Sequence, residues 1–252
     1  METHEYEKLF ELEDQYWWFV GQRLLVQLIL DTFYMQKDQQ NDNQKNLSLL
    51  DVGCGTGKTL SLLQKYGAAQ GIDIAEQAIE FCKKRGFAIK KSDVMDIQFP
   101  DSMFDVVTAL GVFYHKAVTD DVRGFQEIRR ILKPGGRFIM FDCAMKCLYS
   151  KHDIAFHGAR RYSKTELKEK LERAGFTVEK ISYVNTLLFP AVYIKRKIDL
   201  LTNAPVKSDL EMKINPTINK MLTRLYVNEL KLVNYVNYPF GVNIIAVGRK
   251  SL

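Results

Sequence analysis

The segment Leu49–Gly57, which reads LLDVGCGTG, constrains the fold more than any other part of the chain. Glycines occupy every second position, at Gly53, Gly55 and Gly57, directly after a short apolar run. Residues without a Cβ atom let the backbone turn sharply and approach a ligand closely. The helix expected after the turn would present free N–H groups and the positive end of its dipole. The segment therefore predicts a buried strand, a tight turn and a helix that together bind a carboxylate or a phosphate.

Strand and helix patterns alternate on both sides of this turn. The expected strands are Leu47–Val52, Ala69–Ile74, Ala88–Lys91, Phe104–Leu110, Arg137–Asp142 and Thr177–Tyr183. Between them, helical patterns are expected at Thr59–Tyr66, Glu76–Arg85, Asp120–Leu132 and a last helix that begins at Ser163. Alternation of this kind predicts an α/β fold in which a mostly parallel sheet has helices on both faces.

The flanking segments complete one domain of 252 residues. Apolar residues at helical spacing predict one helix over Glu5–Tyr34, and the polar run Gln36–Asn46 predicts an exposed linker. Residues 185–238 break the alternation and predict a helical insertion, before a final strand at Val242–Val247 that we place at a sheet edge. The expected parts are an N-terminal helical lid with linker (1–46), a cofactor-binding core (47–184), a helical insertion that forms a substrate lid (185–238), and the final strand (239–252).

Composition excludes several classes of protein. The net charge is +6, but the basic pairs are scattered, which indicates a solvated surface rather than a nucleic-acid interface. The polar N-terminus does not resemble a secretory signal, and no apolar run is long enough to span a bilayer. We therefore expect a cytoplasmic protein, a monomer or a homodimer, with no membrane span. No zinc spacing, and hence no metal site, is expected from the four cysteines, Cys54, Cys82, Cys143 and Cys147.

Two further carboxylates follow expected strands. Asp73 ends the second strand about 20 residues after the glycine turn, where a carboxylate can bind both hydroxyls of a ribose. The alternative is that Asp73 caps the next helix. Asp93 follows the third strand, where it can accept a hydrogen bond from an adenine amino group while Val94 covers the ring. The alternative for Asp93 is an ordinary loop residue.

These segments together resemble the class I S-adenosylmethionine-dependent methyltransferases. The motifs, in the order and spacing of that family, cover roughly residues 47–142: LLDVGCGTG, GIDIA, SDVMDIQFP, FDVVTALGVFYH and QEIRRILKPGG. A nicotinamide-binding turn would read GxGxxG, one residue longer than the turn here. The resemblance implies a Rossmann-like three-layer sandwich with a seven-stranded sheet whose last strand is antiparallel. It also implies S-adenosylmethionine as cofactor and S-adenosylhomocysteine as product.

The resemblance assigns roles to individual residues. It places the methionine end of the cofactor near Asp51 and the glycine turn, the ribose at Asp73 and the adenine at Asp93 and Val94. The run Tyr16-Trp17-Trp18-Phe19 resembles a motif of a bacterial subset that is similar to methyltransferase type 11. These aromatic residues could pack in the core or cover the sulfonium, and we expect Tyr16 or Trp17 to face the cofactor. The expected cofactor residues are Tyr16, Trp17, Asp51, Gly53, Cys54, Gly55, Gly57, Asp73, Ile74, Asp93, Val94 and Leu110.

His115 and Tyr114 are the candidate catalytic residues. His115 lies just past the fourth strand, where active sites of open α/β sheets form, and its ordinary pKa suits proton transfer near neutrality. The alternative is that His115 is structural, with Tyr114 in the acceptor pocket. We interpret His152 and His157 as lid residues rather than metal ligands. Arg160 and Arg161 are interpreted as a solvated face, with an acidic substrate as the alternative.

The predicted function is methyl transfer to an oxygen or nitrogen of a small-molecule acceptor by in-line displacement. The covering helices favour a compact acceptor over a polymer, so no nucleic-acid partner is favoured. The alternatives are an RNA or protein methyltransferase on the same fold and, in another class, a non-catalytic nucleotide-binding partner subunit.

Overall fold

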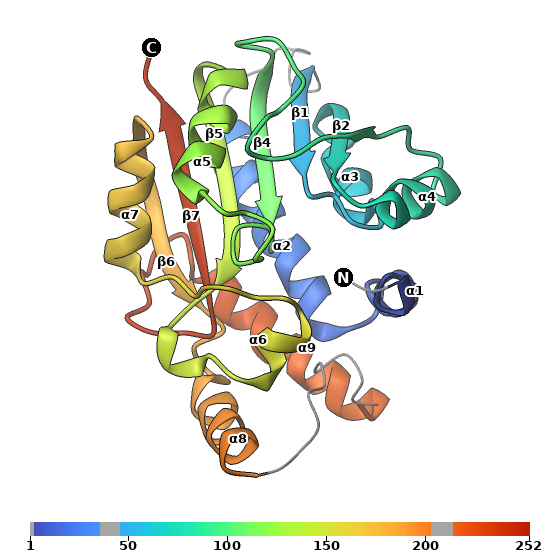
Figure 1. Cartoon of the computed structure of the whole chain (residues 1–252). Helices are drawn as coiled ribbons and strands as arrows, with labels where there is room; N and C mark the ends of the chain where they lie inside the picture. The colour runs from blue at the N-terminus through green and yellow to red at the C-terminus, as the bar shows by residue number, and fades with distance from the viewer. Residues whose placement is uncertain (1–2, 36–45, 203–213) are drawn as a thin grey trace.

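A computed structural model describes residues 3–35, 46–202 and 214–252 of the chain. Its centre is a seven-stranded sheet of order β3-β2-β1-β4-β5-β7-β6 (Figure 1). The strands are β1 (Leu47–Val52), β2 (Gly67–Asp73), β3 (Lys90–Lys91), β4 (Phe104–Leu110), β5 (Leu132–Cys143), β6 (Phe176–Val184) and β7 (Asn243–Lys250). Neighbouring strands from β3 to β5 pair in parallel, whereas β7 pairs antiparallel with both β5 and β6. The predicted α/β class and the antiparallel last strand are confirmed.

The predicted edge position of the last strand is wrong. β7 lies between β5 and β6, and the edges of this sheet are β3 and β6. The physical reason is visible in the burial of β7, because every residue from Asn243 to Gly248 is buried. A strand that is apolar on both faces belongs in the interior of a sheet, where helices cover both sides.

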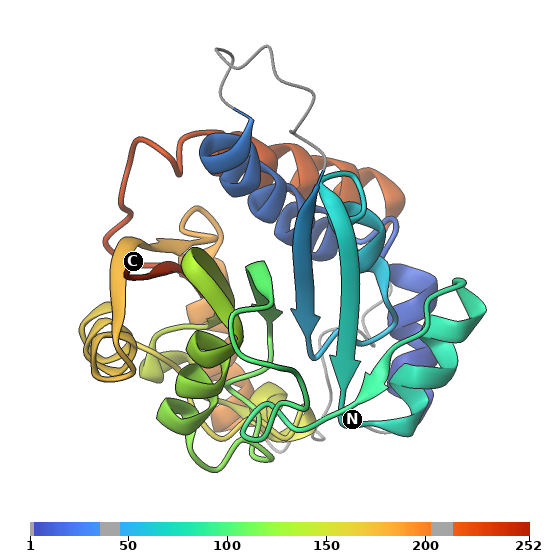
Figure 2. The same ribbon diagram turned by 90° about the horizontal axis from the view of Figure 1, so that it is seen from above.

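Helices cover both faces of the sheet (Figure 2). One face carries α2 (Trp17–Tyr34), α3 (Lys58–Leu63) and α9 (Pro216–Lys231), and the other carries α5 (Asp121–Ile131) and α7 (Lys164–Arg173). Helix α4 (Glu76–Lys84) packs beside β2. Three further helices and one short 3-10 turn lie toward the carboxyl ends of the parallel strands: α1 (Thr3–Leu12), η2 (Lys146–Leu148), α6 (Lys151–Ala155) and α8 (Phe189–Leu201) (Figure 1).

The alternation of side chains along the strands produces the two cores. Leu49 of β1 and Val106 of β4 belong to the cluster under α2 and α9, whereas the next residues, Leu50 and Val107, belong to the cluster under α5 and α7. Successive side chains of a strand point to opposite faces, so a continuous apolar run is needed to fill both cores. The strand FDVVTAL meets this requirement, which explains why its boundaries are predicted correctly.

The N-terminal segment is two helices, not the single helix predicted over Glu5–Tyr34. α1 ends at Leu12 and α2 begins at Trp17, and Tyr16 between them has extended backbone. The break lets the side chain of Glu13 reach the glycine turn, as described below. The predicted linker lies outside the described residues except for Asn46, which is exposed. Among the described residues, no helix is long and apolar enough to cross a membrane.

Close packing of α2 against α9 depends on Gly21. A Cβ atom at this position would lie 2.2 Å from Cδ1 and 2.3 Å from Cε1 of the buried Tyr226 ring. Replacing a helical glycine by alanine normally favours folding by about 1 kcal/mol. Here we expect Gly21→Ala to lower the free energy of unfolding by about 1–3 kcal/mol, measured by urea denaturation, because the overpacked ring must move. A more stable Gly21→Ala protein would contradict this packing. Adding Tyr226→Leu to the Gly21→Ala protein should restore the lost stability.

Candidate active site

A cavity of about 260 Å³ opens at the carboxyl ends of the central strands. Its floor is formed by strand ends and by the glycine turn, and its walls come from α2, α6 and α8 and the segments next to them. Open α/β sheets bind ligands in this position, beyond the carboxyl ends of the strands where the strand order reverses. The strand order reverses here between β1 and β4, so the cavity lies where the fold predicts a ligand.

The glycine turn forms the floor of the cavity at the β1 end. Gly53 has φ +65°, and a Cβ atom on it would lie 2.5 Å from Cγ2 of Val112. The turn is fixed by Asp73, whose Oδ2 accepts a hydrogen bond of 3.0 Å from the Gly55 N–H. The other oxygen of Asp73 accepts from Ala75 N–H at 2.9 Å, at the start of α4. The Asp73 carboxylate therefore links the turn to the next helix, and burial raises its pKa.

Two buried carboxyl groups line the cavity at the ends of β1 and β5. Asp51 accepts a hydrogen bond of 2.6 Å from the Thr108 hydroxyl, and burial raises its pKa to about 7. Asp142 accepts from the N–H groups of Phe113, Tyr114 and Cys143 at 2.9, 3.1 and 2.7 Å. Burial raises the pKa of Asp142 to about 7 as well, because desolvation outweighs these three hydrogen bonds.

The segment between α1 and α2 is attached to the glycine turn through Glu13. The Thr56 hydroxyl donates to the Glu13 carboxylate at 2.7 Å, and Arg85 forms an ion pair with the same carboxylate. Arg23 donates to the backbone carbonyl of Glu13. Burial raises the pKa of Glu13, while Thr56 and Arg85 act in the opposite direction. This arrangement holds α1 close to the turn, with Leu9 over Gly55. The sequence did not indicate this role, because Glu13 lies within a predicted helix, where a charged residue is ordinary.

The aromatic run at the start of α2 packs on the sheet and also lines the cavity. Tyr16, Trp17, Trp18 and Phe19 all line the cavity. Trp18 also packs edge-on against Phe141 of β5, with ring centroids 5.7 Å apart, and its Nε1 donates to the Asn243 Oδ1 at 3.2 Å. The run therefore anchors α2 to the sheet while its rings form one wall of the cavity.

The cavity includes some of the predicted cofactor residues and leaves others outside. Tyr16, Trp17, Asp51, Gly53, Cys54, Gly55 and Leu110 line it. Those outside its lining are Gly57, Asp73, Ile74, Asp93 and Val94. Asp73 nevertheless touches the turn directly, and Ile74 beside it is exposed. Val94 is buried against α5, because it lies 3.6 Å from the place a Cβ of Gly124 would take.

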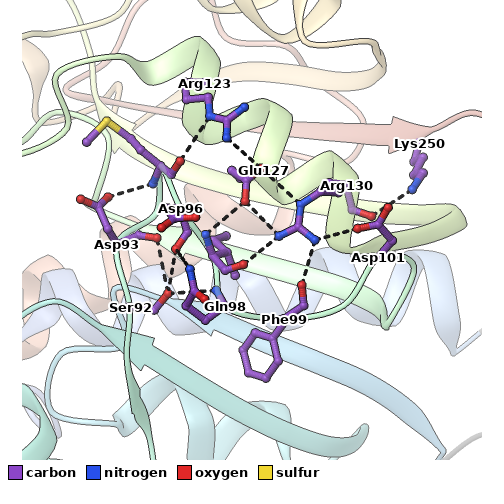
Figure 3. Close-up of polar contacts among 12 residues, drawn as sticks. Ser92, Asp93, Asp96, Gln98, Phe99, Asp101, Arg123, Glu127, Arg130 and Lys250 are labelled. Atoms are coloured by element: carbon purple, nitrogen blue, oxygen red, sulfur yellow. Dashed lines mark hydrogen bonds and ion pairs between the residues drawn. The ribbon is translucent and has the colours of Figure 1, made fainter.

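The loop that carries Asp93 is held in place by α5 (Figure 3). Glu127 accepts a hydrogen bond of 3.1 Å from the Ile97 N–H, and Arg130 donates to the carbonyls of Ile97 and Phe99 at 2.7 and 2.8 Å. Arg130 and Glu127 also form an ion pair of 2.9 Å. Asp93 itself accepts from Met95 N–H at 2.8 Å. The QEIRR part of the motif QEIRRILKPGG thus fixes the loop that the resemblance assigns to adenine.

Only one of the two candidate catalytic residues lines the cavity. Tyr114 lines the cavity, and burial raises its pKa far above the ordinary value, so its phenol stays protonated near neutrality. His115 lies outside the cavity lining and accepts a hydrogen bond of 3.1 Å from the Ala117 N–H through Nδ1. Burial lowers the pKa of His115 to about 4, so the imidazole is neutral at pH 7. Its Nε2 is buried with no hydrogen-bond partner among the described residues.

Several polar cavity residues are not among the predicted site residues, and they include Asp142, Arg161, Asn185 and Arg196. Asp142 ends the strand RFIMFD, and the rule that strand ends form sites could have identified it. Arg161, interpreted above as solvated, is instead buried and lines the cavity, together with Asn185 and Arg196. Arg160 lies outside the lining and donates to the carbonyls of Phe113 and Val118 at 3.2 and 2.6 Å. No group of metal-binding side chains is found among the described residues.

Comparison with known proteins identifies the domain. Residues 50–140 match the family model described as a methyltransferase domain. Residues 50–140 therefore form a domain of the class I S-adenosylmethionine-dependent methyltransferase family. The cofactor of this methyltransferase family is S-adenosylmethionine, as the glycine turn and the motifs that follow it predict.

The names of the relatives that are similar in sequence indicate very different acceptor molecules. A sterol 24-C-methyltransferase of Gibberella zeae is 33% identical over 118 residues, which cover 43% of this chain and 30% of that protein. A second one, of Yarrowia lipolytica, is 30% identical over 157 residues, covering 54% of this chain and 41% of the relative. A tRNA (carboxymethyluridine(34)-5-O)-methyltransferase of Mus musculus is 28% identical over 130 residues, 51% of this chain and 19% of the relative. The chain thus spans less than half the length of these relatives.

Solved structures with the same fold cover nearly the whole chain. A methyltransferase of Thermotoga maritima aligns with a TM-score of 0.61 at 19% identity, over 98% of this chain and 95% of that one. The protein solved in complex with the Haloferax volcanii Trm112 methyltransferase activator gives 0.60 at 18% identity, over 99% and 94%. The [4+2]-cyclase SpnF gives 0.57 at 19% identity, over 92% and 81%. At this level of identity the alignments show the fold alone.

The raised pKa of Asp51 makes a prediction about stability. Its ordinary pKa is near 4, so between about pH 4 and pH 7 the folded protein retains a proton that the unfolded chain releases. The stabilising contribution is therefore present at low pH and is lost as the pH rises through about 7. We expect the free energy of unfolding of the wild type to fall relative to Asp51→Asn by about 1–4 kcal/mol over this range.

Urea denaturation of both proteins at several pH values measures this difference. Asp96→Asn serves as a control, because Asp96 is an exposed carboxylate. The difference in free energy of unfolding between the wild type and Asp96→Asn should not change over this pH range. A constant difference between the wild type and Asp51→Asn would contradict the raised pKa.

Proposed function

We propose that the protein transfers the methyl group of S-adenosylmethionine to an oxygen or nitrogen atom of a small-molecule acceptor held in the 260 Å³ cavity. The observation that carries the proposal is the position of the cavity, which joins the glycine turn to a second group of polar side chains contributed by other elements. The first group suits the methionine end of the cofactor, and the second suits an acceptor. Because one cavity contains both groups of residues, the methyl donor and the acceptor can lie in line for the displacement.

The residues of the glycine-turn end fit the cofactor. Gly53 and Gly55 line the cavity without side chains, which lets a ligand approach the backbone. The carboxylates of Asp51 and Glu13 line the same end and suit an ammonium group. The faces of Tyr16 and Trp17 suit the positive sulfonium, which aromatic rings attract. Asp73 at the end of β2 would bind the ribose, and Asp93 with Val94 would bind the adenine.

The cofactor supplies an activated methyl group, and the protein's part is to align the acceptor and to exclude water. Alignment of two bound reactants contributes much of the rate in reactions of this kind. Tyr114 lies in the cavity as a protonated phenol, so it would orient the acceptor as a hydrogen-bond donor. A general base helps when the acceptor atom carries a proton, but the displacement does not require one.

The enclosing helices favour a small acceptor. Residues of α2, α6 and α8 line the cavity, together with the aromatic side chains Trp18 and Phe156. We assign residues 185–238 as a helical insertion that forms the substrate lid, residues 1–46 as an N-terminal helical lid with a linker, and residues 47–184 as the cofactor-binding core. RNA or protein as the acceptor remains the alternative, because one relative is named as a tRNA methyltransferase. A partner without activity is the alternative of another class.

The first test measures the thermal midpoint of the protein with S-adenosylhomocysteine, NAD or ATP. A ligand that binds only the folded state raises this midpoint. We expect a rise with S-adenosylhomocysteine alone, followed by transfer of labelled methyl to members of a small-molecule panel. A rise with NAD, or none with S-adenosylhomocysteine, would refute the proposal, and transfer to tRNA alone would favour the alternative.

Asp73 tests the cofactor site. Removing its carboxylate should weaken the binding of S-adenosylhomocysteine by about 1.5–3 kcal/mol, the cost of losing hydrogen bonds to a charged group. Calorimetry on Asp73→Ala should therefore show a dissociation constant raised roughly tenfold to 150-fold. Glu80→Ala removes a carboxylate from the exposed side of α4 and should leave the affinity unchanged. Equal affinity for Asp73→Ala and the wild type would remove the ribose role.

Variants of His115 and Tyr114 distinguish a general base from a residue that orients the acceptor. His115→Ala is expected to lower turnover more than it lowers cofactor affinity if the imidazole acts as a base. Its pKa of about 4 makes it a weak base, and an activity that falls below about pH 4–5 would report its protonation. Tyr114→Phe should raise KM for the acceptor. Steady-state kinetics on an identified acceptor distinguish these effects, and undiminished turnover of His115→Ala would leave the histidine with a structural role.

A further inference from the structure

The side chain of Asn185 is buried in the cavity wall, and its oxygen has no hydrogen-bond donor. Asn185 directly follows β6, lines the cavity and is 2% exposed. Of the side-chain oxygens that are buried in the described lining of the cavity, Asn185 Oδ1 is the one without a partner. A buried acceptor that has lost water and gained no donor destabilises the fold, and native proteins contain few of them. The position therefore indicates that a bound molecule supplies the donor.

A second asparagine at the same end of the sheet shows what a structural amide looks like here. Asn243 of β7 also lines the cavity and is 3% exposed. Its Oδ1 accepts from Trp18 Nε1 at 3.2 Å, and its Nδ2 donates to the Asp142 carbonyl at 3.5 Å. The register pairs Val184 with Asn243, so Asn185 lies one residue beyond this pair. The protein thus uses both amide atoms of Asn243 and leaves the Asn185 oxygen unused.

The backbone around Asn185 is fixed, so the amide is held at the cavity wall. Its φ of +63° lies in the left-handed region, which asparagine tolerates better than most residues. Glu229 of α9 accepts from the N–H groups of Thr186 and Leu187 at 2.9 and 3.1 Å. The Thr186 hydroxyl donates to the Phe240 carbonyl at 2.6 Å. A site with a fixed backbone can receive a ligand with little further loss of freedom.

The place of β6 in the sheet puts Asn185 on the far side of the cavity from the glycine turn. The strand order from the turn outward is β1-β4-β5-β7-β6 (Figure 1). Neighbouring strands lie about 4.8 Å apart, so the ends of β1 and β6 are separated by about 19 Å across the sheet. The methionine end of the cofactor is proposed to bind at the β1 end. Asn185 would therefore contact the acceptor rather than the cofactor.

The carboxylate oxygens near this end already have donors. Asp153 accepts from Arg161 Nε at 2.7 Å and from the Ser150 N–H at 2.8 Å. Asp142 accepts from three backbone N–H groups. A ligand O–H or N–H would therefore find a vacant acceptor at Asn185, whereas a carboxylate or an ether oxygen there would leave Oδ1 unpartnered. Apolar side chains of the same lining include Phe156, Val192 and Val242.

We propose that Asn185 is a specificity-determining residue whose Oδ1 accepts a hydrogen bond from an O–H or N–H group of the acceptor. This group lies at the end of the acceptor away from the glycine turn, so it is distinct from the atom that receives the methyl group. The acceptor is then a molecule with an apolar body and a hydroxyl or amino group at its far end. This inference names the substrate class of the proposed methyltransferase and rests on that function.

The test uses the whole protein saturated with S-adenosylhomocysteine. Calorimetry compares 3-phenylpropan-1-ol with its isomer 2-phenylethyl methyl ether, which has the same atoms but no donor, and with 3-phenylpropylamine. We expect the alcohol or the amine to bind about fivefold or more tightly than the ether, and the stronger of the two tells a hydroxyl from an amino group. Binding of the ether as tight as that of both donors, or no binding of either donor, would overturn the inference.

Matched variants assign the preference to Asn185. Asn185→Gly removes the amide and suits the left-handed backbone, so it should fold and bind the preferred donor and the ether within about twofold of each other. Asn185→Asp keeps an acceptor oxygen and should keep the preference. Thr186→Val is the control, because it removes a neighbouring hydroxyl outside the cavity lining and should leave the preference unchanged. A preference that survives in Asn185→Gly, or that Thr186→Val abolishes equally, would overturn the inference.

The two proposals fail in different ways. If S-adenosylhomocysteine itself does not bind the wild type, the proposed function falls and this inference falls with it. If S-adenosylhomocysteine binds and the probes show no preference for a donor, only the inference falls. Asn185→Gly adds an independent readout, because it should abolish the preference without changing the affinity for S-adenosylhomocysteine.

Discussion

The hydrogen bonds of one carboxylate hold the ligand-binding end of the sheet together. Asp73, at the end of β2, accepts from Gly55 in the turn after β1 and from Ala75 at the start of α4. The turn must follow a left-handed path at Gly53, Gly55 and Gly57, which a chain can keep only where neighbouring groups fix it. The position of the cavity, and the approach of any ligand to the backbone, depend on this bond.

The N-terminal segment depends on the same turn. Glu13 is buried against Thr56 and paired with Arg85, so the break between α1 and α2 is fixed by a residue of the turn and by the end of α4. Arg85 also lies over the ring of Phe10, 4.2 Å from its centroid, which holds α1 in place. The contacts that hold this N-terminal segment therefore end at the glycine turn, so a ligand bound at the turn would lie next to the segment that covers it.

Sequence patterns predict the parts of this molecule in which local chemistry and tertiary position agree. The turn LLDVGCGTG and the strand FDVVTAL have residue types that suit only one structure, and both are predicted correctly. Prediction fails where tertiary contacts decide. Apolar spacing cannot show that α8 turns its isoleucines outward, and a triplet of basic residues, Lys195 to Lys197, gives no sign that only the central one is buried. The predicted edge position of β7 is wrong, although its continuous apolar run, buried on both faces of the sheet, suits an interior strand.

The interior place of β7 has a consequence for how the molecule assembles during synthesis. β5 and β6 are joined only through β7, so a nascent chain that has emerged through β6 has no partner for that strand. The glycine-turn half, from β1 to β5, contains only pairings between segments already made, and it can fold first. The side of the cavity to which Asn243 of β7 contributes must wait for a long-range pairing, which is slow. On a ribosome, the glycine-turn side of the cavity would thus form before the side to which β7 contributes.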